Sequence, residues 1–326
     1  MPFDAISSAS PIRSLNYQLL ALALAVVYGS LLAGLPLDVF KDRASYLVYA
    51  EHSWLIFERY WETGPLAALA NEPLWLLLNT GLTAVFPPEI TLRIVIFVPA
   101  TLVGWLVLRQ DSRQFVWLLL FLLLPQVIKN HIIHLRQGVA IGVFLAGWFT
   151  SRQPLRWILL AATPFIHASF FFVLFLFVLV RIMRSLRLAA DLRTLLVAGA
   201  AAGIGSSLGL IEQLGARQAE NYTSSAADTS GLGFAFWALI FIVMFLQGRE
   251  FLRQYAFEVG TITFYLCTYF FFPITARIFE STLLLALLSG LRLTGWKSLA
   301  FLGLFLSYFL HQWLVRVDLP GFGWGL

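Results

Sequence analysis

The chain has 326 residues, of which 60% are hydrophobic and 12% charged, and its mean hydropathy is +0.82. This composition excludes an ordinary soluble domain and is typical of an integral membrane protein. The formal charge of +5 does not indicate nucleic-acid binding, because no exposed basic domain is long enough to carry it. The single cysteine, Cys267, excludes an intramolecular disulfide.

The first predicted element is an apolar segment from Tyr17 to Leu35, which follows Arg13 and is long enough to cross a bilayer. We expect it to be an uncleaved anchor rather than a signal peptide. Further apolar runs follow near residues 72–86, 89–108, 114–128, 135–150, 155–166, 168–183, 193–211, 231–247, 255–272, 274–290 and 297–315. Several are shorter than the ~20 residues that a span needs, so we expect tilted or broken helices.

Basic residues between these runs predict which segments are cytoplasmic. They are Arg13, Arg109, Arg113, Arg152, Arg156, Arg181, Arg184, Arg187, Arg193, Arg249, Arg253, Arg292 and Lys297. Under the positive-inside rule these positions lie in the cytoplasm, which leaves the segments at about 36–71 and 211–230 as external loops.

The same rule requires an even number of crossings between Arg13 and Arg109. The shortest early run, Pro73 to Phe86, begins after Glu72 and ends at two prolines, so we expect a re-entrant or interfacial helix on the outer side. The prediction is a single all-α, polytopic membrane domain over residues 1–326, with about eleven transmembrane helices. Its N-terminus lies in the cytoplasm and its C-terminus outside.

This topology brings charged and titratable residues together on the outer side: Asp38, Asp42, Glu72, Arg136, His167, Arg277 and Glu280. Ionisable groups at membrane depth are costly and by default mark a functional site. Arg136 cannot neutralise itself, and its planar fork suits phosphate, whereas His167 suits proton transfer near neutral pH. The set predicts an outward-facing site for an anionic, hydroxylated ligand.

Structural explanations stay open for these residues. Arg136 could extend to lipid headgroups and His167 could be a packed core histidine. Arg277 and Glu280, three residues apart on one helical face, could form an internal ion pair. Asp42 and Arg43 could be solvated in their loop.

Cofactor chemistry has little support in the sequence. His131 and His134 have i, i+3 spacing but no third ligand nearby, so we expect no metal site. The chain contains no Walker A motif, no glycine-rich dinucleotide turn and no Gly-x-Ser-x-Gly elbow, so nucleotide-driven chemistry is not indicated.

The order of motifs resembles a known family. An Asp/Tyr-rich external segment, 38–49, precedes Glu72-Pro-Leu-Trp75, then Leu135-Arg-Gln-Gly-Val-Ala140 and Phe165-Ile-His-Ala-Ser169. Over roughly residues 36–185 this resembles the EpsG/Wzy-like group of bacterial polysaccharide polymerases, relatives of O-antigen polymerases and ligases. The spacing of Asp and Tyr in the external segment departs from the usual pattern.

The resemblance implies a GT-C-like, all-helical glycosyltransferase that polymerises undecaprenyl-diphosphate-linked repeat units at the outer face of the bacterial inner membrane. Membrane lipids and a chain-length-regulating co-polymerase are the further partners it implies. In such a reaction, arginine can stabilise the charge that develops on the leaving diphosphate, and a base must activate the acceptor hydroxyl.

We therefore assign the predicted residues to three roles. Arg136 and Arg277 bind the diphosphate, His167 is the base with Glu72 as its alternative, and Asp38, Asp42 and Glu280 orient sugars.

Other functions remain open. A transporter or flippase of lipid-linked sugars would predict inverted internal repeats and charges near the bilayer midplane, and no clear repeat is found. A membrane acyltransferase that modifies polysaccharide could also use a membrane histidine. A ligase or single-sugar transferase would use similar groups.

Overall fold

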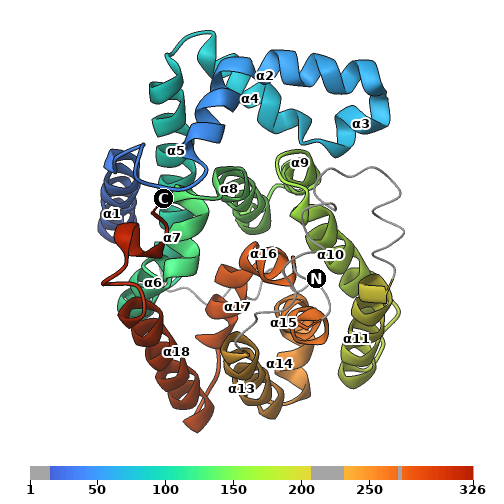
Figure 1. Ribbon diagram of the computed structural model, residues 1–326. Helices are drawn as coiled ribbons and strands as arrows, with labels where there is room; N and C mark the ends of the chain where they lie inside the picture. Colours follow the sequence, from blue (N-terminus) through green and yellow to red (C-terminus); the bar gives the residue numbers. More distant parts are fainter. Residues whose placement is uncertain (1–14, 207–230, 271–273, 326) are drawn as a thin grey trace. The chain divides into compact units, whose positions relative to one another are not determined.

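The computed structural model describes residues 15–206, 231–270 and 274–325. Regular secondary structure in these ranges is helical, apart from one isolated antiparallel bridge between Phe40 and Gly325 (Figure 1). The chain divides into two compact units. Of the described residues, unit 1 contains 171–206, 231–270 and 274–308, and unit 2 contains 15–170 and 309–325. Arg13 and the predicted external loop at 211–230 lie outside the described residues.

Unit 2 begins with nine α-helices: α1 (Leu15–Gly34), α2 (Arg43–Thr63), α3 (Pro65–Ala70), α4 (Pro73–Thr83), α5 (Pro88–Leu108), α6 (Phe115–Leu122), α7 (Pro125–Ile132), α8 (Leu135–Phe149) and α9 (Gln153–Ala162). Two 3₁₀ helices, η2 (Ser112–Gln114) and η3 (Thr163–Phe165), connect them, and η5 (Pro320–Gly323) follows near the chain end. Helix α5 packs on α1 and α8, and α2 lies along α4 (Figure 1).

Helices α1 and α5 run antiparallel. The Tyr17 hydroxyl, near the start of α1, donates to the Leu108 carbonyl at the end of α5, over 2.5 Å. At the other end, Arg93 Nη1 donates to the Ala33 carbonyl over 2.5 Å. The pair therefore returns the chain to the side on which it began, as the charge-based topology requires for Arg109.

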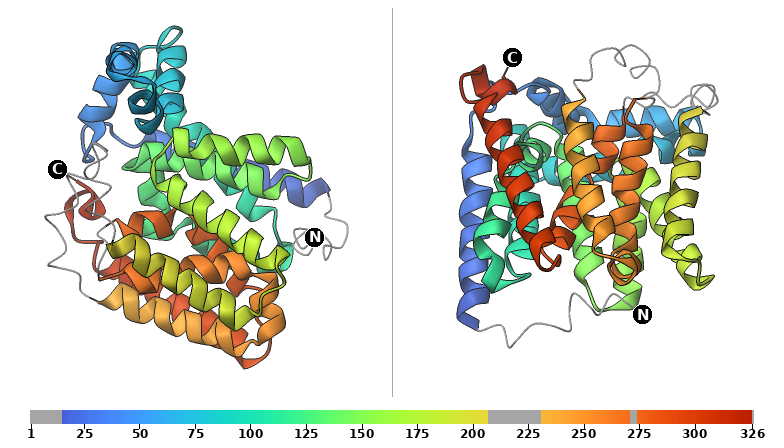
Figure 2. Two further views of the ribbon diagram at one scale, coloured as in Figure 1. Left: turned by 90° about the vertical axis from the view of Figure 1, so that its right-hand side faces the viewer. Right: turned by 90° about the horizontal axis from the view of Figure 1, so that it is seen from below.

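Unit 1 contains α10 (Ser169–Ser185) from its third residue, α11 (Ala190–Ser206), α13 (Leu232–Leu246), α14 (Arg249–Gln254), α15 (Ala256–Thr268), α16 (Thr275–Glu280), α17 (Leu283–Gly290) and most of α18 (Trp296–Leu314). Nearly every residue of α15 is buried, and this helix packs on α11, α13, α16 and α17. Figure 2 gives two further views of these helices. Helix α15 is thus the core element of unit 1.

Few of the described helices could cross a bilayer alone. Helices α1 and α5 are long and apolar enough, and η2–α6 with α7 would be a third span if the pair, bent by 62°, is one crossing. The prediction of about eleven transmembrane helices is therefore not confirmed. Two of the apolar runs are divided between two α-helices: the run at 114–128 forms α6 and α7, and the run at 274–290 forms α16 and α17.

The segment predicted as an external loop at 36–71 is mostly helical. Arg43, Tyr46, Ala50 and Ser53 recur at intervals of three or four residues and form the buried face of α2. This helical spacing indicates a helix, whereas the length and charge of the segment do not. Helix α4, with 11 residues, is only ~16 Å long and cannot cross a bilayer, in agreement with the prediction for 73–86.

The end of the chain packs against the segment before α2. The Lys41 amide donates to the Trp324 carbonyl over 3.0 Å, and Trp324 is buried. The Trp313 indole donates to the Leu123 carbonyl over 3.0 Å. The C-terminal residues and the start of the 36–71 segment therefore lie side by side.

Candidate functional site: a buried carboxylate with three donors

Glu72 is the residue on which the site is built. It precedes Pro73, the first residue of α4, and has the left-handed backbone conformation with φ 59° and ψ 53°. For a residue other than glycine, this conformation costs about 1–3 kcal/mol, and such strain is concentrated at functional sites. The conformation lets the chain end α3 and start α4 while the carboxylate points into the protein.

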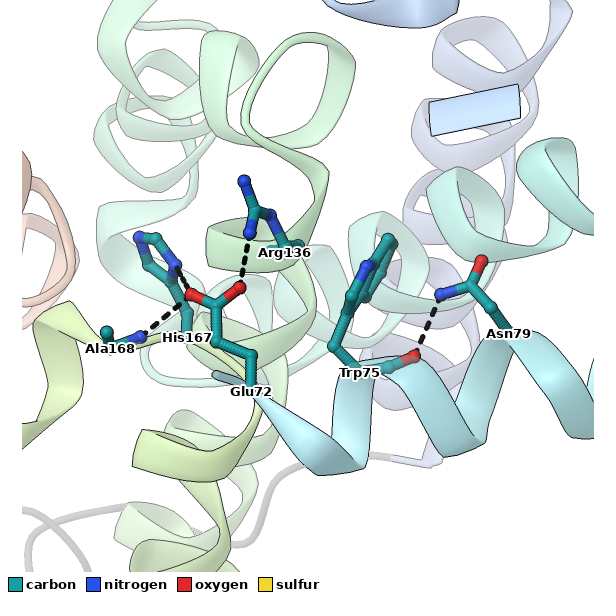
Figure 3. Close-up of polar contacts among 6 residues, drawn as sticks. All are labelled: Glu72, Trp75, Asn79, Arg136, His167 and Ala168. Carbon is teal, nitrogen blue, oxygen red and sulfur yellow. Dashed lines mark hydrogen bonds and ion pairs between the residues drawn. The ribbon is translucent and has the colours of Figure 1, made fainter. Parts of the chain in front are cut away.

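Three donors from two other parts of unit 2 meet this carboxylate (Figure 3). Oε1 accepts the Ala168 amide at 3.0 Å and lies 2.8 Å from His167 Nδ1. Oε2 accepts a hydrogen bond from Arg136 Nη1. The Glu72 side chain is only 4% exposed, so the ion pair with Arg136 is shielded from solvent.

The Glu72 carboxylate is ionised at neutral pH. Burial alone would raise its pKa, but the charge of Arg136 and the hydrogen bonds from His167 and Ala168 together hold the pKa below its ordinary value. An ionised carboxylate can only accept hydrogen bonds, so His167 Nδ1 carries the proton. Nε2 of His167 then bears the lone pair, and it has no hydrogen-bond partner in the described part of the chain.

His167 and Ala168 are held in a short turn between η3 and α10. The His167 amide donates to the Thr163 carbonyl over 3.0 Å, and the Phe170 amide donates to the His167 carbonyl over 3.0 Å. Thr163 is fully buried. The turn therefore presents the imidazole and the Ala168 amide to Glu72 together.

Arg136 lies in the first turn of α8, and its position depends on the approach of α7. A Cβ atom at Gly138 would lie 2.3 Å from the Asn130 carbonyl oxygen, so only glycine fits there. The Gly138 amide also donates to the His134 carbonyl over 2.9 Å. The close contact between α7 and α8 thus fixes the helix start from which Arg136 projects.

Arg136 is the more exposed of the two side chains that pair with Glu72. Its side chain is 27% exposed, compared with 10% for His167. Its Cζ lies 5.3 Å from the centre of the Tyr49 ring. The guanidinium can therefore bond an anion while it stays paired with Glu72.

The other four predicted residues are Asp38 and Asp42 in unit 2 and Arg277 and Glu280 in unit 1. Asp38 and Asp42 are exposed in the segment before α2, and within the described residues neither side chain has a hydrogen bond or ion pair. Arg277 and Glu280 share α16, as their spacing predicted, but α16 belongs to unit 1. Their roles stay predictions.

The two histidines considered for a metal are not part of a ligand cluster. His131 is buried, with its ring centre 6.4 Å from that of Tyr28. Within the ranges that the structure describes, no group of three His, Cys, Asp or Glu side chains could hold a metal ion.

Sequence reasoning gave no role to the aromatic residues around Arg136. Tyr46 is buried and interacts electrostatically with both Arg136 and Glu72. Its ring centre lies 5.8 Å from that of Trp75. The spacing of Tyr46 from Tyr49, one helical turn, was the signal that could have found them.

These features define an all-helical membrane protein with a buried carboxylate that joins an arginine to a histidine. The chain belongs to the EpsG family, whose family model matches residues 19–324. The resemblance noted over residues 36–185 is thereby confirmed and extends over nearly the whole chain. Membership suggests a polysaccharide polymerase or a glycosyltransferase-like role. Comparison with curated proteins and with solved structures gave no match.

Proposed function

We propose that this protein polymerises lipid-linked oligosaccharide repeat units at the outer face of the bacterial inner membrane. The donor is a glycan on undecaprenyl diphosphate, and the acceptor is a hydroxyl of a second lipid-linked unit. The observation that carries this proposal is the single ionised carboxylate of Glu72, which holds both a partly exposed arginine and a histidine with an open Nε2.

The triad supplies the two functions that glycosyl transfer needs. His167 Nε2 accepts the proton of the acceptor hydroxyl as its oxygen bonds to the anomeric carbon of the donor. The bond from that carbon to the diphosphate breaks, and the electron pair leaves with the diphosphate. Arg136 stabilises the charge that develops there.

Glu72 is best placed as a positioning residue rather than as the base. Its oxygens are occupied by three donors, and its lowered pKa makes it a poor proton acceptor. It would fix the tautomer of His167 and stabilise the imidazolium that forms. We assign Arg277 to the same diphosphate, and Asp38, Asp42 and Glu280 to the sugars. A co-polymerase that sets chain length is part of the proposal.

Loss of Arg136 tests the proposal directly. In cells, Arg136→Ala should abolish long glycan chains while single lipid-linked repeat units persist, because the leaving group loses its cation. Arg152→Ala is the matched control, since Arg152 is exposed at the start of α9. Normal chain-length ladders from Arg136→Ala at wild-type expression would contradict the proposal.

A reconstituted assay separates the alternatives. Purified protein in vesicles that contain lipid-linked units should lengthen glycans. Movement of the units between leaflets without elongation would indicate a transporter, and acyl incorporation without chain growth would indicate an acyltransferase.

A further inference from the structure

Arg43 is a buried cation without a hydrogen-bonded partner. The residue is 2% exposed, and all three of its guanidinium nitrogens are buried without a hydrogen bond in the described part of the chain. Its guanidinium lies over the ring of Phe40, whose centre is 5.6 Å from Cζ. Burial lowers the pKa of Arg43 to about 10, so the group is still charged at neutral pH.

The charged neighbour of Arg43 adds to the positive charge. Arg93, on α5, interacts electrostatically with Arg43 and so disfavours its protonated form. Arg93 uses Nη1 to bind a backbone carbonyl, that of Ala33. A buried guanidinium with a second arginine nearby and no carboxylate paired to it is costly unless an anion completes the site.

A second unsatisfied donor lies beside Tyr46. Trp75 is only 1% exposed, and its indole Nε1 has no hydrogen-bond partner among the described residues. Tyr46 links the two donors, because it interacts electrostatically with Arg43 and its ring contacts that of Trp75 edge-on. The group formed by Arg43, Trp75 and Arg93, which we call the α2 donor cluster, offers donors and positive charge to a ligand.

The α2 donor cluster adjoins the triad. Tyr46 interacts electrostatically with Arg136 and Glu72 as well as with Arg43. A polymerase of the proposed kind must hold two polyprenyl diphosphates at once, one on the donor and one on the acceptor. Arg136 can serve one of them, and its partner Glu72 repels a second anion at the same place.

We propose that the α2 donor cluster binds the phosphate groups of the lipid-linked acceptor, while Arg136 binds those of the donor. This assignment to the acceptor rests on the proposed function, whereas the presence of a second anion site does not. The bound anion bridges Arg43 and Trp75 Nε1 and neutralises the charge shared by Arg43 and Arg93.

Binding of a sugar-free polyprenyl diphosphate to the purified full-length protein in nanodiscs tests the site. Wild type should bind at two sites. Arg43→Met and Arg136→Met should each weaken one site at least tenfold and leave the other. Arg59→Met is the matched control, because Arg59 is exposed on the same helix, and it should retain both sites. Unchanged two-site binding by Arg43→Met would overturn the proposal.

Folding is checked separately from binding. Without ligand, Arg43→Met should melt at or above the wild-type temperature, because a buried unpaired charge is replaced by an apolar chain of similar length. Trp75→Phe keeps the ring but removes the N–H, and it should weaken the same site several-fold. Full binding by Trp75→Phe and by Arg43→Lys together would count against the cluster.

Two further experiments identify the ligand and distinguish a failure of this proposal from a failure of the proposed function. Inorganic diphosphate distinguishes a free anion from a lipid headgroup. If Arg43 is needed for binding of inorganic diphosphate but not for binding of polyprenyl diphosphate, the acceptor assignment is overturned. In an elongation assay, Arg43→Met should raise KM for the acceptor at least tenfold with little change for the donor. Two-site binding without any elongation would sink the polymerase function and leave the second anion site standing.

Discussion

At the scale of the residue, the site depends on how one carboxylate is shared. Glu72 pairs with Arg136 through one oxygen and with His167 and Ala168 through the other. A carboxylate that holds an imidazole by Nδ1 fixes the lone pair at Nε2, where a substrate proton can be taken. In the proposed mechanism, one buried charge thus positions both the cation and the base.

Replacement of Glu72 by glutamine should separate charge from shape. Glu72→Gln keeps the size of the side chain but leaves Arg136 without its counter-charge and His167 without a partner for the imidazolium. We expect glycan elongation to fall about 100-fold or more, measured with lipid-linked units in vesicles. Activity within twofold of wild type would exclude a positioning role for Glu72.

The same substitution has an expected pH signature in stability. Because the folded-state pKa of Glu72 is lowered, its ionisation stabilises the fold above the ordinary glutamate pKa of about 4.3, and this contribution is lost as pH falls below that value. The stability advantage of wild type over Glu72→Gln should therefore be constant from pH 7 to about 5. It should then narrow by roughly 1.4 kcal/mol per pH unit at lower pH. Thermal melts of both proteins at each pH measure this, and a constant difference down to pH 3 would contradict it.

At the scale of the element, short helices and the turns between them aim the site residues. Glu72 begins α4, Arg136 begins α8, and His167 lies between η3 and α10. Each functional side chain thus stands at a helix start or in a turn, where the backbone can approach a neighbouring helix. The close contact of α7 with α8 at Gly138 is the clearest case.

An added methyl group at Gly138 should move Arg136. Gly138→Ala places Cβ against the Asn130 carbonyl, a backbone atom that cannot rotate away, so α7 and α8 must separate. We expect a loss of about 1–3 kcal/mol in stability and a larger loss of elongation than stability alone explains. Gly81→Ala on α4 is the control, because a Cβ there meets nothing within 4 Å. Equal behaviour of the two variants would show that the α7–α8 contact does not position Arg136.

At the scale of the whole molecule, the antiparallel α1–α5 pair sets the sidedness of unit 2. Helix α5, with 21 residues, is ~31 Å long, enough to cross the hydrocarbon core. Arg109 and Arg113 follow its end, and Glu72 and α4 precede its start. Under the positive-inside rule we therefore predict that Glu72 and Arg109 lie on opposite sides of the membrane, with the triad on the outer side.

Labelling of single cysteines tests this sidedness. In a Cys267→Ser background, a membrane-impermeant thiol reagent should modify Asp42→Cys in cells with a permeable outer envelope. It should modify Arg113→Cys only after the inner membrane is opened. Asp42 and Arg113 are both exposed and both belong to unit 2. The reverse pattern would place the triad in the cytoplasm and exclude polymerisation at the outer face.

The sequence by itself determined the all-helical membrane class. Composition and apolar runs reflect the lipid environment of the chain, and they do not depend on how its helices pack. It also determined Glu72, Arg136 and His167 as candidates, since ionisable groups are costly beside apolar runs. Only the tertiary structure decided that these three meet, because Glu72 is 64 and 95 residues from its partners and no local pattern sets such contacts. It likewise decided that α2 is a helix that buries Arg43, and that the runs at 114–128 and 274–290 are each divided into two short helices, since both depend on which faces neighbouring helices cover.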